Sequence, residues 1–198
     1  MSDNNLIKEL RELTGAGIMD VKEALAEGGD DRDKALEILR KKGIAKLGKK
    51  ADRIAKEGII ESYIHAGGRI GALVELNCET DFVARTEDFQ NLAKELALHI
   101  AASNPLYVNR EEVPSEVVEK ELEIYKEQIK DQGAGKPEEI VQKMLTGKLD
   151  KYYQESCLLE QSFVKDPDKK ISDLIAESTA KMGENVQVRR FSRFHLGN

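Results

Sequence analysis

The sequence predicts an α+β protein, in which a bundle of three helices precedes a core of helices packed on a mainly antiparallel three-stranded sheet. Apolar residues recur at helical spacing near the N-terminus, and two strand-like runs flank a Gly-rich turn. Two further helical patterns flank a second Gly-rich turn. We expect domains at 1–50 and 58–198 with a linker at 51–57, and a protruding helical hairpin at about 114–156.

Residues 1–50 contain the breaks expected of three short helices. Thr14–Gly17 ends the first helix, and Gly28-Gly29 closes the second. Asp30 or Asp31 can cap the third helix. The Gly-Ala-Gly sequence follows a helix and lacks the Lys-Ser/Thr of a phosphate-binding loop, so it indicates tight packing between helices.

The core begins with two predicted strands, Gly58–His65 and Arg69–Asn77. The turn Ala66–Gly68 joins them, because glycine tolerates positive φ there. Leu73 interrupts the polar face of the second strand, so we expect that face to be covered as well. A helix capped by Thr86 then carries one apolar stripe that we expect to pack on these strands, made of Phe89, Leu92, Ala93, Leu96 and Ile100.

The second half of the chain supplies the helical hairpin and the last strand. Pro114 and Pro137 fit the first turns of the two hairpin helices. An extended stretch is predicted at 157–167, before a final helix that ends at Gly183. The last strand, Asn185–Leu196, loses its alternation in the middle, which indicates either a bulge or a strand buried on both sides.

The charge distribution argues against a direct nucleic-acid partner. The net charge is −6, whereas phosphate binding needs clustered cations. The basic run Arg40–Lys56 is the one exception, and a solvated face is its preferred interpretation. No apolar run is long enough for a bilayer, so no membrane partner is expected. No signal or transit peptide is visible, which predicts a cytoplasmic location and leaves open an organellar origin with the targeting peptide removed.

The nucleophilic and metal-ligating residues do not indicate an enzyme. Cys78 with His65 or His99 and a carboxylate has the residue types of a nucleophilic site, but a thiol at the end of an apolar strand is normally structural. Cys78 and Cys157 lie far apart, which fits a reducing compartment. No Cys/His pair has ligand spacing. We therefore predict no catalytic residue, no metal site and no cofactor.

The most informative segment is Arg69–Arg85, in which an apolar strand runs into a polar turn. Thr80 can accept backbone N–H bonds as a helix N-cap, so Asp81 and Phe82 lie at a defined helix start. An aromatic residue beside a carboxylate on an ordered turn is suited to enter a partner's pocket. The alternative, a helix cap followed by core residues, is preferred for Val83, and from the residues alone both interpretations of Asp81-Phe82 stand about even.

This segment and Leu13–Leu25 closely resemble translation elongation factor Ts, the guanine nucleotide exchange factor of elongation factor Tu. Shorter matches cover nearly the whole chain, at Gly58–Ile60, His99–Pro105, Phe163–Asp166 and Arg193-Phe194. The resemblance implies a ubiquitin-associated-like N-terminal bundle and a regulator of a GTPase rather than an enzyme.

The resemblance also implies the partner and the site. Thr80, Asp81, Phe82 and Val83 would enter the nucleotide-binding domain of elongation factor Tu and displace the Mg²⁺ bound with GDP. GDP release would then allow GTP to bind, so the implied partner is elongation factor Tu in its GDP-bound and nucleotide-free forms. The N-terminal bundle would be a second contact, centred on Leu10, Leu13, Thr14, Gly15, Ala16, Gly17, Met19 and Asp20. Helical packing accounts equally well for most of the apolar positions in this set.

One departure from the family bears on assembly. Longer members carry two related core subdomains and a C-terminal helical module, whereas this sequence shows one core copy. We therefore expect a homodimer in which the core sheets or the hairpin helices pair across a two-fold axis. The competing hypothesis is a non-exchange adaptor whose helical bundle binds a ubiquitin-like or ribosomal partner, which would leave the segment Asn77–Val83 without a purpose.

Overall fold

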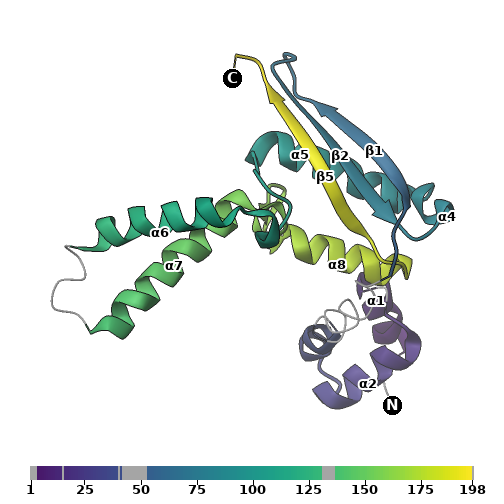
Figure 1. Ribbon diagram of the computed structural model, residues 1–198. Helices are drawn as coiled ribbons and strands as arrows, with labels where there is room; N and C mark the ends of the chain where they lie inside the picture. Colours follow the sequence, from purple (N-terminus) through teal and green to yellow (C-terminus); the bar gives the residue numbers. More distant parts are fainter. Residues whose placement is uncertain (1–3, 15, 40, 42–52, 131–136, 198) are drawn as a thin grey trace. The chain divides into compact units, whose positions relative to one another are not determined.

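The computed structural model describes residues 4–14, 16–39, 41, 53–130 and 137–197 (Figure 1). The chain divides into two units, Met1–Leu98 with Ser172–Asn198, and His99–Ile171. Within the described residues, no helix is both long and apolar enough to cross a membrane.

Helices make up the whole described N-terminal part. Helix α1 spans Asn4–Thr14, α2 spans Ile18–Gly28, and residues 32–39 are also helical. The three predicted helices are therefore present, and they enclose a small core of their own: Ile7, Leu10, Val21, Ala24, Leu25, Ala35 and Leu39. The boundaries of the predicted linker stay a prediction, because most of residues 40–52 lie outside the described part.

Local capping explains where these helices begin and end. Gly29, at φ 69°, ends α2 in the left-handed conformation that glycine adopts readily. The Asp31 carboxylate accepts 3.0 Å hydrogen bonds from the backbone N–H groups of Asp33 and Lys34. Asp31 rather than Asp30 is therefore the cap of the third helix.

The central sheet has three antiparallel strands in the order β1-β2-β5, which confirms the predicted fold class. They are β1 (Glu57–Ile64), β2 (Ile70–Cys78) and β5 (Gln187–His195). The register between β2 and β5 shifts at Glu75/Leu76. The predicted irregularity of the last strand is therefore a bulge, which strengthens the local twist of the sheet.

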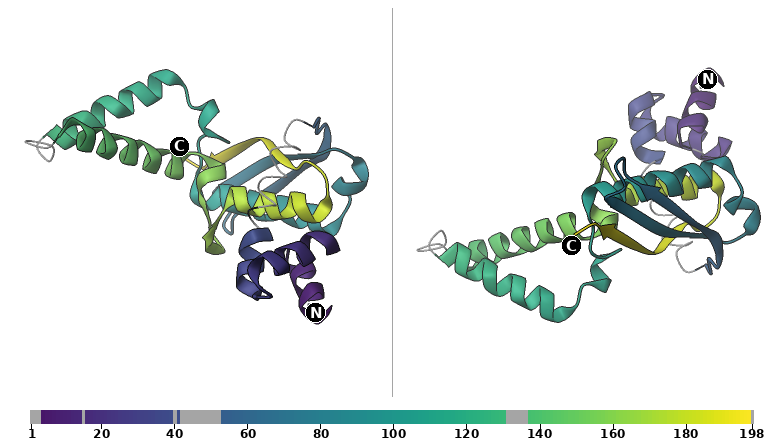
Figure 2. Two further views of the ribbon diagram at one scale, coloured as in Figure 1. Left: turned by 90° about the horizontal axis from the view of Figure 1, so that it is seen from below. Right: turned by 90° about the horizontal axis from the view of Figure 1, so that it is seen from above.

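One face of the sheet is buried under two helices. Residues 87–98 of α5 (Glu87–Ser103) and 172–182 of α8 (Ile171–Met182) lie along it (Figure 2). Every residue of the predicted α5 stripe is at most 4% exposed. On the strands, alternate residues are buried with it: Ala72, Val74 and Leu76.

The opposite face of the sheet is open in this chain, contrary to the expectation drawn from Leu73. Leu73 is 43% exposed, and the apolar side chains nearby are more exposed still. Strand register places four apolar residues on this face: Ile60, Ile64, Leu73 and Phe194. Ile64 and Phe194 both pair with Gly71, Ile60 pairs with Glu75, and Leu73 pairs with Ser62 and Ser192. We call these four residues the open sheet face.

The second unit contains the predicted helical hairpin, formed by α6 (Ser115–Lys130) and α7 (Glu138–Ser156). Ile129 and Leu145 are buried between them. Pro137 occupies the N-cap of α7 rather than its first turn. The predicted Gly133–Gly135 turn lies outside the described residues.

The stretch 157–167 is more structured than predicted. It contains the 3₁₀ turn Leu158–Glu160 and enters a two-stranded sheet formed by β3 (Ser162–Phe163) and β4 (Asp166–Lys170). The buried side chain of Gln161 organises it, since its Oε1 lies 2.9 Å from His99 Nε2 and its Nε2 donates to the Glu155 carbonyl at 2.6 Å. Such a polar contact over 62 residues leaves no local sequence pattern.

Candidate functional site

A four-residue helix, α4 (Asp81–Ala84), follows β2 and presents the candidate site. Thr80 has extended backbone geometry, with φ −128° and ψ 154°, and its Oγ1 accepts a 3.4 Å hydrogen bond from the Val83 backbone N–H. The Ala84 N–H donates to the Thr80 carbonyl at 3.3 Å. The predicted N-cap is confirmed, and the start of α4 is therefore fixed at Asp81.

The side chains of α4 divide between solvent and the interior. Phe82 is 80% exposed, whereas Ala84 is only 5% exposed and Val83 is half-buried. Burial of Phe82 in the core is therefore excluded for this chain. The alternative interpretation, core residues after a helix cap, applies to Ala84 and in part to Val83. A large aromatic side chain in water is a poor source of fold stability and a suitable anchor for a partner.

The acidic residue of the site has a partner that the sequence did not single out. Arg85 Nη2 lies 2.9 Å from Asp81 Oδ2; the Arg85 side chain is largely in solvent and that of Asp81 is about half exposed. Asp81 also stands in the first turn of α4, where a negative charge interacts favourably with backbone N–H groups. The carboxylate is therefore held beside Phe82 by an exposed pair that a binding partner can replace.

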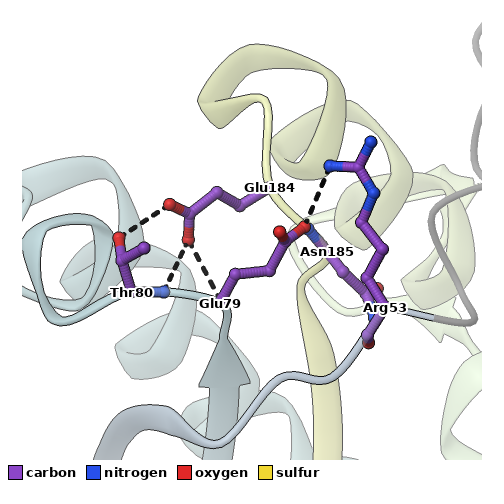
Figure 3. A network of polar contacts seen from close by, with 5 residues as sticks. All are labelled: Arg53, Glu79, Thr80, Glu184 and Asn185. Carbon is purple, nitrogen blue, oxygen red and sulfur yellow. Dashed lines mark hydrogen bonds and ion pairs between the residues drawn. The ribbon is translucent and has the colours of Figure 1, made fainter.

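The turn that leads into α4 is tied to the end of α8 by a carboxylate (Figure 3). Glu184 Oε2 accepts hydrogen bonds from the backbone N–H groups of Glu79 (3.1 Å) and Thr80 (3.0 Å). Glu184 Oε1 accepts one from the Thr80 hydroxyl at 2.7 Å. No sequence pattern indicated Glu184, because it is 104 residues away from Thr80.

A second set of bonds runs in the opposite direction between the same two segments. Glu79 Oε1 accepts a 2.7 Å hydrogen bond from the Asn185 backbone N–H and lies 3.5 Å from Arg53 Nη1. The Asn185 side chain donates to the Arg53 carbonyl at 2.9 Å. Figure 3 shows how these groups join three parts of the chain around the turn before α4.

Cys78 is fully buried at the end of β2, as expected of a structural thiol. Burial, together with the nearby Glu184 carboxylate, raises the pKa of the Cys78 thiol to about 11. The thiol is therefore protonated near neutral pH, whereas a reactive cysteine needs a lowered pKa. Among the described residues, no cluster of three or more His, Cys, Asp or Glu side chains has an arrangement that could hold a metal ion.

The predicted contact residues of the bundle differ widely in exposure. Leu10 is fully buried in the bundle core, so its side chain is not available to a partner of the folded bundle, contrary to the predicted contact set. Leu13 (54%) and Met19 (67%) are exposed, and so is Ile18 (48%), which the prediction omitted. We call Leu13, Ile18 and Met19 the bundle patch.

The other predicted bundle residues are polar or small. Thr14, Ala16 and Asp20 are half-buried, Gly17 is exposed, and Gly15 lies outside the described residues. Among the described residues, a Cβ added at Gly17 would meet only the Asp20 side chain, at 3.2 Å, so no tight helix packing is seen at this glycine within that part of the chain. The closer approach between helical segments is at Gly28, where a Cβ would lie 3.2 Å from the Ala35 backbone nitrogen.

Comparisons with known proteins identify the family of the chain. The family described as "Elongation factor TS" matches residues 4–198. The chain is 58% identical over 192 residues to a protein named Elongation factor Ts from Fervidobacterium nodosum, which covers 97% of this chain and 96% of that protein. It is 59% identical over 193 residues to the protein of the same name from Thermotoga petrophila, covering 98% and 95% of the two chains.

A third relative extends the match to the whole sequence. The Elongation factor Ts of Carboxydothermus hydrogenoformans is 56% identical over 197 residues, which covers 100% of this chain and 90% of that one. These matches extend over at least 97% of this chain and at least 90% of each relative. The chain therefore belongs to the elongation factor Ts family.

Proposed function

We propose that this chain is the guanine nucleotide exchange factor of elongation factor Tu. It binds the GDP complex, inserts Phe82 and Asp81 into the nucleotide-binding domain and displaces Mg²⁺, so that GDP leaves and GTP can bind. The observation that carries the proposal is the 80% exposure of Phe82 on a capped and anchored turn, in a chain of this family.

The chemistry of the ion favours this route. Mg²⁺ demands near-ideal octahedral geometry and keeps several water ligands. A benzyl side chain wedged between partner elements shifts the groups that hold those waters, and the carboxylate of Asp81 competes for the same polar groups. Loss of the ion removes a positive charge from the diphosphate and weakens its binding. A thousandfold faster release requires a barrier only about 4 kcal/mol lower.

Exchange of this kind is a coupling between two binding equilibria. The chain binds the nucleotide-free partner more tightly than the GDP complex, and by linkage either nucleotide weakens the binding of the chain. No bond in a substrate of the chain itself is made or broken, so the protein acts as a regulator of a GTPase rather than as an enzyme. We propose the cytoplasm as its location.

The bundle patch is the proposed second contact on the partner. Leu13, Ile18 and Met19 are adjacent to the connection between α1 and α2 and expose apolar surface there. Apolar side chains grouped in this way supply interface area. Leu10 acts indirectly, through the packing of the bundle core.

The open sheet face supports a homodimer. Ile60, Ile64 and Phe194 are each at least 65% exposed, and together with Leu73 they present an apolar surface to solvent. Faces of antiparallel sheets stack about 10 Å apart when their side chains interdigitate. A two-fold axis through this face would bury it in both copies, so of the two predicted arrangements we favour pairing of the core sheets over pairing of the hairpin helices.

Release of labelled GDP from elongation factor Tu tests the proposed function. We expect the chain to accelerate release, and Phe82→Ala to reduce the acceleration at least about a hundredfold, since removal of one well-placed group has effects of this size. Ile54→Ala is the matched control, because Ile54 is 72% exposed but lies outside α4. Unaccelerated release with the wild-type chain would contradict exchange and favour the adaptor hypothesis.

A further inference from the structure

The helix that carries Phe82 is too short to hold its own shape. Formation of a first helical turn is unfavourable in isolation, and α4 has only four residues, Asp81–Ala84. Phe82 adds little packing, because 80% of its surface is in solvent. The buried Ala84 seats α4 on one side, so the orientation of Phe82 and Asp81 depends to a large part on contacts made by the residues that precede α4.

Glu184 makes most of the polar contacts of that turn. One carboxylate accepts three hydrogen bonds, from the Glu79 N–H, the Thr80 N–H and the Thr80 hydroxyl, at 2.7–3.1 Å. Hydrogen bonds to an ionised acceptor are roughly twice as strong as neutral ones. A single side chain thus fixes both peptide units that lead into α4.

The same carboxylate also orients the N-cap of α4. The Thr80 hydroxyl donates a hydrogen bond to Glu184 Oε1, which leaves an oxygen lone pair to accept from the Val83 N–H, 3.4 Å away. Without Glu184, the hydroxyl hydrogen has no fixed direction and the cap weakens. The geometry of α4 therefore depends on Glu184, which lies outside this helix.

The position of Glu184 is set in turn by the end of α8. Gly183 has φ +80° and donates its N–H to the Thr179 carbonyl at 3.0 Å, which ends the helix in a left-handed turn. Asn185 then donates its backbone N–H to Glu79 Oε1 at 2.7 Å. Neighbouring residues of the two segments thus exchange hydrogen bonds in both directions.

We propose that Glu184 is a positioning residue for nucleotide exchange: it holds Glu79 and Thr80 so that Phe82 and Asp81 meet the partner in one orientation. This inference rests on the proposed exchange function. It assigns to Glu184 no contact with the nucleotide, its metal or the reacting groups. Its removal lowers the maximal rate of GDP release more than it lowers the affinity for the partner, because the bundle patch and the rest of the surface still bind.

The experiment measures GDP release from elongation factor Tu over a range of chain concentrations. We expect Glu184→Ala to lower the maximal rate roughly tenfold to a hundredfold, as misplacement by about 1 Å does, while the half-saturating concentration changes much less. Glu184→Gln keeps an oxygen for the two backbone N–H groups but loses the charge and the acceptor for the hydroxyl. It should therefore fall between wild type and Glu184→Ala.

A double-mutant cycle separates positioning from general stability. If Glu184 acts through Phe82, Glu184→Ala should cost less than about twofold in a chain that already carries Phe82→Ala. Thr80→Val removes the hydroxyl that donates to Glu184 and accepts from the Val83 N–H, so it tests whether the link from Glu184 to the N-cap matters if Glu184→Ala proves poorly folded. Lys181→Ala is the matched control, since Lys181 lies near the same helix end in an exposed pair with Asp88 at 2.7 Å.

The outcomes distinguish this inference from the function on which it rests. Slow release with Phe82→Ala but normal release with Glu184→Ala, Glu184→Gln and Thr80→Val would overturn the role of Glu184 alone. Equal rate losses for Glu184→Ala in the presence and absence of Phe82 would also overturn it. Normal release with Phe82→Ala would overturn the proposed exchange mechanism, and the role of Glu184 with it.

Discussion

The Cys78 thiol donates a hydrogen bond to the carbonyl oxygen of Thr80, with 3.1 Å between sulfur and oxygen. That carbonyl also accepts from the Ala84 N–H. The end of β2 and the first turn of α4 are therefore linked through one buried side chain, independently of Glu184.

The first prediction concerns this thiol. Cys78→Ser shortens the buried side chain and places a more polar group in the same site, so we expect the free energy of unfolding to fall by about 1–3 kcal/mol. Exchange activity should remain close to that of the wild type, because a hydroxyl can still donate to Thr80. Urea denaturation measures the first effect and GDP release the second, and a large loss of activity in a folded variant would contradict the prediction.

The second prediction follows from the raised pKa of Cys78. The folded state holds the thiol proton up to a pKa of about 11, against an ordinary value of 9.0. Between these two values the folded chain binds more protons than the unfolded chain, so its stability decreases as the pH rises through this window and is unaffected by this group below it. Denaturation curves between pH 8 and pH 11 test this, and Cys78→Ala should lose that part of the alkaline sensitivity.

The third prediction concerns acid sensitivity in the second unit. The Val164 N–H donates to His99 Nδ1 at 3.3 Å, so His99 is neutral, with its proton on Nε2 toward Gln161. Burial lowers the pKa of His99 below its ordinary value of 6.5, in spite of the contact with Gln161. Stability is therefore complete above that value and declines as the pH falls below it.

NMR titration of the histidine ring signals measures the pH at which His99 becomes protonated. The His99 ring signals should titrate below the ordinary value of 6.5. His99→Gln should remove the part of the acid sensitivity that comes from this ring. A titration of His99 at or above 6.5 would contradict the prediction.

The fourth prediction compares two glycines with positive φ. At Gly58 (φ +147°) an added Cβ would lie 2.1 Å from the Leu76 carbonyl oxygen, whereas at Gly67 (φ +92°) it would meet no atom of the described residues within 4 Å. Gly67→Ala should cost about 1–2 kcal/mol through backbone strain alone. Gly58→Ala should cost considerably more, because β1 must also move away from β2. Thermal denaturation of the two variants compares strain with and without the clash.

The fifth prediction identifies the dimer surface. Leu73 on the open sheet face and Ile124 on α6 have similar exposure, 43% and 41%. Leu73→Glu should convert the homodimer to a monomer, because it places a charge in the proposed contact, while Ile124→Glu should leave the dimer intact. Light scattering over a range of concentrations gives the mass. The reverse result would assign the contact to the hairpin helices, and a wild-type monomer at every concentration would exclude the homodimer.

Sequence patterns predicted the parts of the molecule that depend on neighbouring residues. The cap at Thr80, the end of α8 at Gly183 and the α5 stripe that begins with Phe89 all follow from local chemistry, and each is present. The bulge in β5 was also detectable, because an extra residue disturbs the alternation of side chains.

The missed features depend on contacts between distant residues. A glutamate after a helix-ending glycine is ordinary in sequence, and only the fold brings Glu184 to Thr80. Leu10 and Leu13 have the same apolar character, but α1 turns one into the bundle core and the other into solvent. The short strands β3 and β4 rest on a buried contact between His99 and Gln161, which no periodicity reveals.

The bulge in β5 also determines where this strand can change length. Leu76 pairs with Val188 and Glu75 pairs with Arg190, so Arg189 is the residue of β5 that has no paired residue on β2. Loss of any paired residue would reverse inside and outside for part of the strand. Loss of Arg189 would leave every remaining pair intact. It is therefore the position where evolution or design can shorten β5 without reversing which side chains face the core.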